Sequence, residues 1–366
     1  MSVTVNGTSG LTFNDASTQN TAATGFGFKN RIINGNMRID QRNAGASVTP
    51  TTSGTYTLDR WITGLSQASK FSVQQGTSGV AAVNATAQSN YLAVTSTSAY
   101  TLLSTDQFNI QQRIEGFNIA DLGWGYANAK PVTISFYVNS SLTGTFGGSL
   151  RNNAADRSYP FTYSIPVAST WTVISITIPG DTTGTWLTTN GIGVSVIFGL
   201  GVGTTLSGTA GAWAAANYLS ATGAVSVVST SGAILFITGV QLEKGSTATS
   251  YDLRPYGTEL QLCQRYYWQQ SSSTTFTTGF YRSGNTSLEN NKRILPVPMR
   301  VTPNCTATSI TGTCYTNGTS ASVTGLTAIT GDDNLQINIV VTTAASIQGL
   351  PGWLNITSVV TATAEL

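Results

Sequence analysis

The side chains that perform most enzyme chemistry are missing from this sequence or widely scattered in it. The chain of 366 residues has no histidine, three cysteines and 15 acidic residues. Without histidine there is no Ser-His-Asp or Cys-His nucleophile and no imidazole base or metal ligand. The cysteines lack the paired spacing of a zinc site, and the glycines follow no phosphate-binding or dinucleotide-binding pattern. We therefore expect no metal and no cofactor.

Paired carboxylates are the one enzymatic chemistry that the composition leaves open, because glycosidases need only two of them. Most acidic residues stand alone, and the only adjacent pair is Asp332–Asp333 in a Gly-Asp-Asp-Asn turn. Carboxylates in turns commonly bond to their own backbone. The regular short repeats of a large parallel β-helix are also absent. The sequence predicts no enzyme, with a polysaccharide depolymerase kept as an alternative.

Aromatic residues in polar, glycine-rich loops suggest binding chemistry instead. Sugar rings have apolar faces that stack on Trp and Tyr, and loops expose such side chains more than strands do. The candidate glycan-binding residues are Trp124, Tyr126, Trp186, Trp213 and Trp353. For any one of them, packing at the end of a sandwich or against another subunit is the more frequent use of an aromatic ring. Trp61 and Trp171 lie in strand-like runs and are predicted to be core residues.

A dense cluster of charged and tyrosine residues lies between residues 239 and 268, in a chain that is only 9% charged. Its members that could pair or hydrogen-bond are Glu243, Asp252, Arg254, Glu259, Arg265, Tyr266 and Tyr267. Asp252, Glu259 and Glu243 are possible partners for the two arginines, and tyrosine hydroxyls add short-range hydrogen bonds. We interpret the cluster as a structural junction between domains or subunits.

The elements that must position these residues are mostly strands. Thr, Val, Ile and Tyr recur in short runs, and 38 glycines supply turns. Residues 131–138 and 171–181 alternate apolar and polar side chains, which predicts strands with one buried face, as in antiparallel sandwiches. Residues 232–243 are more continuously apolar, which favours a central position in a sheet.

One helix is predicted, beginning just beyond Pro255, where Leu260, Cys263 and Tyr267 give one apolar face. The predicted fold is all-β, with two antiparallel, jelly-roll-like β-sandwich domains joined by this helix. The segments are an N-terminal β attachment and oligomerisation segment (1–27), a first sandwich (28–255), the helical junction (256–269) and a small C-terminal sandwich (270–366).

Charge and cysteine content limit the partners and the place of assembly. A net charge of +2 without a basic face predicts no nucleic-acid partner. The N-terminus lacks the basic and apolar regions of a signal peptide, and no run is long enough to span a membrane. Three cysteines give no disulfide framework, although Cys305 and Cys314 could face each other in a hairpin. We expect free, semi-buried thiols and assembly in a reducing compartment.

Three signatures in this order resemble a family of bacteriophage tail-fibre and tail-appendage proteins: NRIINGN from Asn30, Asp59–Arg60–Trp61, and the segment from Ile237 to Tyr267. The sequence GTSGLTFNDASTQNTAA near the N-terminus is similar to the short repeat that introduces such fibres. A weaker likeness is to jelly-roll carbohydrate-binding modules. Gly239 and residues 37–40 do not reproduce the acidic residues that hold calcium in those modules, so no calcium site is expected.

The resemblance implies a homotrimeric virion tail fibre, assembled in the host cytoplasm, whose N-terminal strands pair between chains. It implies attachment to other tail or baseplate proteins through the N-terminal segment and binding of a host-surface polysaccharide. A purely structural adaptor or decoration protein is the first alternative.

Overall fold

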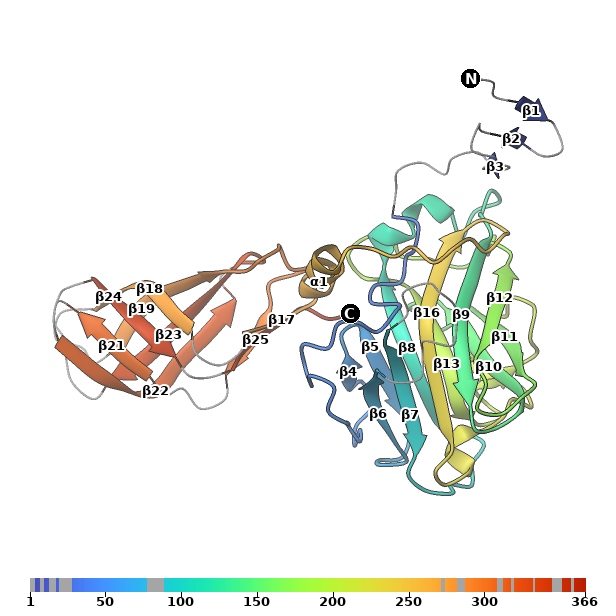
Figure 1. The fold of residues 1–366 in the computed structure, drawn as a ribbon, viewed down its shortest axis with the longest axis horizontal. Helices are drawn as coiled ribbons and strands as arrows, with labels where there is room; N and C mark the ends of the chain where they lie inside the picture. Colours follow the sequence, from blue (N-terminus) through green and yellow to red (C-terminus); the bar gives the residue numbers. More distant parts are fainter. Residues whose placement is uncertain are drawn as a thin grey trace.

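The computed structural model places the backbone of residues 4–6, 10–12, 18–19, 28–77, 89–270, 274–281, 287–307, 312–316, 319–331, 333–343, 351–356 and 359–366. Side chains are described for residues 28–77, 89–270, 294–306, 322, 333–336 and 359–366. Figure 1 shows a large β-sandwich, a smaller β-barrel and one short helix, α1, between them. The expectation of a mostly β chain with a single short helix is confirmed.

The sandwich has two antiparallel sheets. The six-stranded sheet contains, in spatial order, β11 (Ser158–Ile165), β10 (Gly144–Arg151), β13 (Ile192–Val202), β8 (Gln107–Glu115), β5 (Trp61–Leu65) and β4 (Tyr56–Leu58). The five-stranded sheet contains β12 (Thr172–Ile178), β9 (Val132–Ser140), β16 (Ile234–Lys244), β7 (Tyr91–Ser96) and β6 (Phe71–Gly76). β16 is the middle strand of its sheet, as its apolar sequence predicted.

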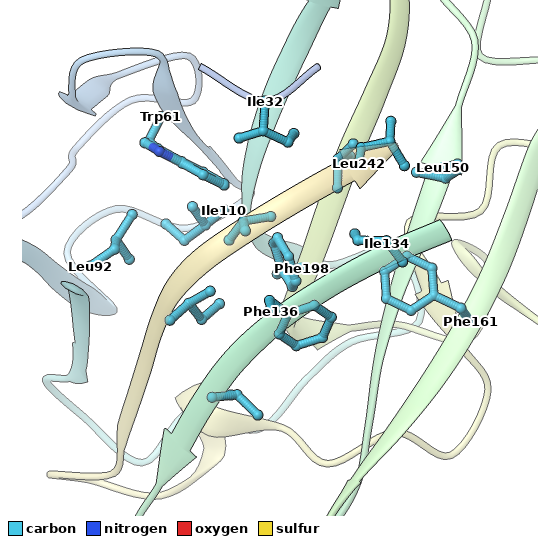
Figure 2. Close-up of a cluster of buried hydrophobic side chains, with 14 of the residues drawn as sticks. Ile32, Trp61, Leu92, Ile110, Ile134, Phe136, Leu150, Phe161, Phe198 and Leu242 are labelled. Carbon is cyan, nitrogen blue, oxygen red and sulfur yellow. The ribbon is translucent and has the colours of Figure 1, made fainter. Parts of the chain in front are cut away.

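Alternating residues of the two sheets meet in one core. Ile134 and Phe136 of β9 face inward, and the Phe136 ring lies 5.1 Å from that of Phe198 in β13 (Figure 2). Trp61 is fully buried in the same core, as predicted, and its indole N–H donates to the Asn34 carbonyl. This inward face leaves the opposite face of each sheet for other contacts.

Short elements complete the sandwich. They are η2 (Gly116–Asn118), η3 (Ala120–Leu122), η4 (Val227–Ser229) and the two-stranded pair β14 (Ser207–Gly208) and β15 (Ser220–Ala221). The N-terminal strands β1 (Thr4–Asn6), β2 (Gly10–Thr12) and β3 (Thr18–Gln19) pair with one another within one chain. Pairing between chains stays a prediction.

The helix α1 (Tyr256–Gln264) begins directly after Pro255. Cys263 is buried with Ile33, Ile39 and Tyr266, and Leu260 packs on them. Tyr267, expected on the apolar face of the helix, instead begins strand β17, because the helix ends at Gln264. No helix among the placed residues is long and apolar enough to cross a membrane.

The region after α1 differs from the expected second sandwich. One three-stranded sheet contains β17 (Tyr267–Gln270), β25 (Val360–Thr363) and β20 (Asn304–Ala307). Six further strands close into a barrel: β18 (Thr274–Tyr281), β19 (Ser287–Ile294), β23 (Gln336–Thr343), β22 (Thr319–Gly331), β21 (Gly312–Thr316) and β24 (Pro351–Ile356). Closure removes the free edges that two small sheets would leave. Alternation predicts strands in both arrangements, so it could not distinguish them.

Candidate functional site

The loop tryptophans predicted as contact residues form an internal cluster, here called the tryptophan cap and defined as Trp124, Trp186 and Trp213. Their ring centroids lie 4.7 to 5.4 Å apart, and every pair is edge-to-face. Trp124 is 4% exposed and Trp186 7% exposed, so the expectation that these loops expose them is wrong. Trp213 is partly buried and packs against the same core.

All three indole N–H groups of the cap are bonded inside the protein. Trp124 donates to the Lys130 carbonyl, Trp213 to the Pro179 carbonyl and Trp186 to the Asp181 carboxylate. Arg157 also binds that carboxylate through two nitrogens, at 2.8 and 2.5 Å. Burial alone would raise the pKa of Asp181, but hydrogen bonds from Arg157 and Thr183 lower it below its usual range. The cap is therefore a closed structural unit.

The two other loop candidates, Tyr126 and Trp353, do not belong to the cap. Tyr126 is 70% exposed, and of the candidates whose side chains the structure describes it is the only exposed one. Trp353 belongs to strand β24, but its side chain lies outside the described residues. The ring contacts of the cap join Trp124, Trp186 and Trp213 and do not include Tyr126.

The charged cluster at residues 239–268 joins α1 to the sandwich. Arg254 pairs with Glu259 at 3.1 Å and with Asp252 at 3.6 Å, and it donates to the carbonyls of Asn30 and Ile32. Glu259 in turn accepts from the backbone N–H of Asn34. Arg254 thus fastens the helix to the segment that carries the first signature.

The carboxylate that Arg265 binds is not one of the acidic residues near it in sequence. It binds Glu115 of β8 through two nitrogens, at 3.0 and 2.7 Å, and the Tyr266 hydroxyl donates to the same carboxylate. Glu243 pairs with neither arginine: its carboxylate accepts from Gln241 and Thr249 and so fixes the loop after β16.

The last residues of the chain return to this junction. Glu365 pairs with Arg42 at 2.7 Å and also with the fully buried Arg60. The Arg42 guanidinium lies 3.6 Å from the ring of Tyr267, and that of Arg60 lies 3.6 Å from the ring of Tyr266. These contacts tie β25 and β17 to the sandwich.

The sequence signatures also have structural uses here. The Asn30 side chain bonds to Val240 and Leu242 of β16, and Gly35 lies so close to the Val240 carbonyl that a side chain there would collide with it. Asp59 accepts two hydrogen bonds from Gln41. Burial raises the pKa of Asp59 to about 6. The residues that carry the family resemblance thus hold the fold together.

A second aromatic group lies on the face of the five-stranded sheet that points away from the core. We call it the outer aromatic cluster and define it as Tyr91, Tyr137, Trp171 and Phe236, which pack together with Ala93. The Tyr91 ring lies 4.7 Å from that of Phe236 and 5.8 Å from that of Trp171. Tyr137, Trp171 and Phe236 are each half-buried and so keep part of their surface in solvent.

Strand register explains how residues from four strands reach one place. Ala93 pairs with Phe236, which pairs with Asn139 of β9. Trp171 precedes Thr172, whose partner is Val138, so it stands beside Asn139 on the same rung. Tyr137 lies one rung away, between Thr238 and Val173. Because Trp171 and Tyr91 come from strands separated by β9 and β16, their side chains lean toward each other across the sheet.

One polar atom beside this cluster has no partner. Asn139 is 8% exposed, and its buried side-chain oxygen accepts no hydrogen bond. A buried acceptor without a donor costs about 1 to 3 kcal/mol. A ligand on this face would instead meet the half-buried rings, which can stack on the apolar face of a sugar.

Sequence reasoning assigned Trp171 to the core, and the structure corrects this. Trp171 has the same strand parity as Val173 and Ser175, which point outward, and not that of Ile174 and Ile176, which pack on the core. The same parity argument puts Tyr137 with Ser135 on the outer face of β9. The signal was therefore present in the alternation itself.

Comparison with known proteins gives structural similarity only. No family model matches the sequence, and no curated protein matches it. Among solved structures, the enzymatically active domain of tailspike protein 4 from bacteriophage CBA120 matches 59% of this chain and 21% of its own, with 14% identity and a TM-score of 0.33. The match therefore spans about a fifth of that tailspike chain.

Carbohydrate-binding modules match over nearly their whole length. A family 4 module (CBM4) has 14% identity over 58% of this chain and 98% of its own, with a TM-score of 0.30. A family 11 module of the cellulosomal cellulase Lic26A-Cel5E of Clostridium thermocellum has 14% identity over 56% and 99%, with a TM-score of 0.27. The chain is thus structurally similar to carbohydrate-binding modules and distantly similar to a phage tailspike domain.

Proposed function

We propose that this protein is a bacteriophage tail-fibre subunit that attaches the virion to its host by binding a surface glycan on the outer aromatic cluster. The observation that carries the binding site is the group of half-buried rings on the sheet face opposite the core. Trp124 and Trp186 of the tryptophan cap are buried, whereas these rings keep part of their surface in solvent, where the apolar face of a sugar can stack on them.

The virion assignment rests on the sequence signatures rather than on the binding face. In this proposal residues 1–27 attach the subunit to other tail or baseplate proteins, residues 28–255 carry the binding face, and three copies assemble into one fibre. The junction contacts of Arg254, Arg265 and Glu365 support a stiff connection between the sandwich and the strands that follow it. A fibre needs such stiffness in order to present its binding face at a defined angle.

Binding of the purified, labelled protein to extracted surface polysaccharides of candidate hosts tests the proposal, with new reducing ends assayed in parallel. We expect saturable binding without cleavage. Trp171→Ala should weaken binding by more than about tenfold, since buried tryptophan contacts dominate many interfaces. Phe117→Ala, which removes an exposed ring elsewhere on the sandwich, serves as the matched control.

The possible outcomes separate the alternatives. Loss of binding in Tyr126→Ala but not in Trp171→Ala would move the site to the loop beside the cap and overturn the assignment of the face. New reducing ends would favour the depolymerase. Correctly assembled protein that binds no surface fraction would favour the structural adaptor.

A further inference from the structure

The face that carries the outer aromatic cluster has a uniform chemical character. Its outward positions on five strands include Ser72, Gln74, Gly76, Tyr91, Ala93, Thr95, Ile234, Phe236, Thr238, Ser135, Tyr137, Asn139, Val173 and Ser175, none of which is charged. Glu243, opposite Thr133 at the end of the face, is charged but buried. The hydroxyl and amide groups there can hydrogen-bond to a polar ligand, but they give no preference for a charged one.

The nearest charges lie at the two ends of the face and are already engaged. Beyond Ser72, the Lys70 ammonium lies 5.0 Å from the centre of the Tyr100 ring. At the other end the buried Glu243 carboxylate accepts three hydrogen bonds from its own loop. Lys244 bonds to Asp121. An anionic ligand would therefore lose its hydration on this face without gaining a cationic partner.

The cluster is also wider than one sugar. Its members come from β7, β16, β9 and β12, four neighbouring strands that together span about 14 Å. Val173, which is exposed at the edge strand beside Tyr137, extends the apolar surface in the same direction. This width suits several linked rings lying across the strands.

We infer that the ligand class is a neutral oligosaccharide that lies across these four strands and stacks its sugar rings on the aromatic side chains. The inference rests on the proposed glycan-binding function and narrows it by excluding uronic acid, sialic acid and sulfated polymers as primary ligands.

Calorimetric titration of the full chain with matched soluble oligosaccharides tests the inference. The probes are neutral glucan, galactan and N-acetylglucosamine oligomers against oligogalacturonate and hyaluronan fragments, each at about 50 and about 500 mM NaCl, where screening differs strongly. We expect binding to a neutral probe only, with affinity that changes less than about twofold between the two salt concentrations. Trp171→Ala should weaken that binding by more than about tenfold, because it removes a stacking surface. Phe117→Ala, which removes an exposed ring elsewhere on the sandwich, should bind like the parent.

Three results would overturn the inference. Preference for an acidic probe, abolished by Trp171→Ala, would refute neutrality while leaving the proposed function standing. Neutral binding that survives Trp171→Ala would refute this face as the site. Absence of binding to every glycan by folded protein would remove the proposed function as well.

Discussion

The tryptophan cap and the outer aromatic cluster are two groups of packed rings on one sandwich, and they differ in what remains unsatisfied. Every indole N–H of the cap has an internal acceptor, and Trp124 and Trp186 are buried. The outer aromatic cluster keeps three half-exposed rings and one amide oxygen without a donor. Ring density alone therefore does not identify a binding site.

The difference follows from where each group lies. The cap closes the space between the end of β12 and the start of β9, where loop carbonyls are close enough to accept from indole nitrogens. The outer cluster lies on the middle of a sheet, where the backbone groups already bond to neighbouring strands. The buried oxygen of Asn139 therefore has no backbone donor left to bond to.

The sharpest way to break this comparison is to remove a ring from each group. Trp124→Ala would leave a cavity beside Trp186 and Trp213 and should lower the free energy of unfolding by about 3 to 5 kcal/mol. Trp171→Ala should cost much less stability, because its ring is already half in solvent. Chemical denaturation followed by tryptophan fluorescence and far-UV circular dichroism measures both.

The matching binding data complete the test. Folded Trp124→Ala should retain its glycan affinity, while Trp171→Ala should lose it. If Trp124→Ala instead lost affinity at unchanged stability, the cap would be the binding group and the assignment of roles would be reversed.

A second prediction extends the comparison to the junction, where charged groups are satisfied internally. Arg254→Ala would leave the buried Glu259 carboxylate without its cation and should lower stability by about 3 kcal/mol. Glycan affinity should not change, because Arg254 bonds to residues 30 and 32 and to Glu259, none of which belongs to the outer aromatic cluster. Thermal unfolding and calorimetric titration check the two parts separately, with Arg38→Ala, a cation that contacts only the exposed Tyr256 ring, as control. A local loss of affinity with unchanged melting would contradict the structural role.

Much of the sandwich was predictable from local patterns. The alternation in residues 131–138 fixes which side chains of β9 face the core, and the continuous apolar run of β16 indicates its central place. Pro255 marks the start of α1. These features depend on periodicity and backbone sterics, which a short stretch of sequence contains.

The candidate site was only half predictable, for a physical reason. Parity places Trp171 and Tyr137 on the outer face, but only long-range pairing brings them to Tyr91 and Phe236, which lie about 50 to 100 residues away in sequence. The loop tryptophans were predicted to be exposed, and Trp124 and Trp186 are buried, because contacts between distant loops decide whether a loop side chain is exposed. Glu115 as the partner of Arg265, 150 residues away, is a third contact of that kind.

The smallest expected effect is a change of stability with pH that leaves glycan binding unchanged. Burial raises the pKa of Asp59 to about 6, whereas its usual value is 3.8. The folded state then holds the proton more tightly than the unfolded chain, so the stability from this group is fully present below about pH 4 and is lost as the pH rises through about 6. Asp59→Asn cannot titrate and also loses one of the two bonds from Gln41, a loss that does not vary with pH.

The stability difference between Asp59→Asn and the parent should therefore move in favour of the variant by on the order of 1 to 2 kcal/mol between pH 4 and pH 7. Carboxylates with lowered pKa, such as Asp181, change stability in the opposite direction but equally in both proteins. Urea unfolding at several pH values measures the difference. Glycan affinity of the parent should stay constant over the same range, since the outer aromatic cluster contains no carboxylate and Glu243, at the end of the face, is buried. If glycan affinity changed with pH as Asp59 titrates, ionisation of Asp59 would affect the binding face. Stability and binding would then not depend on separate groups of residues.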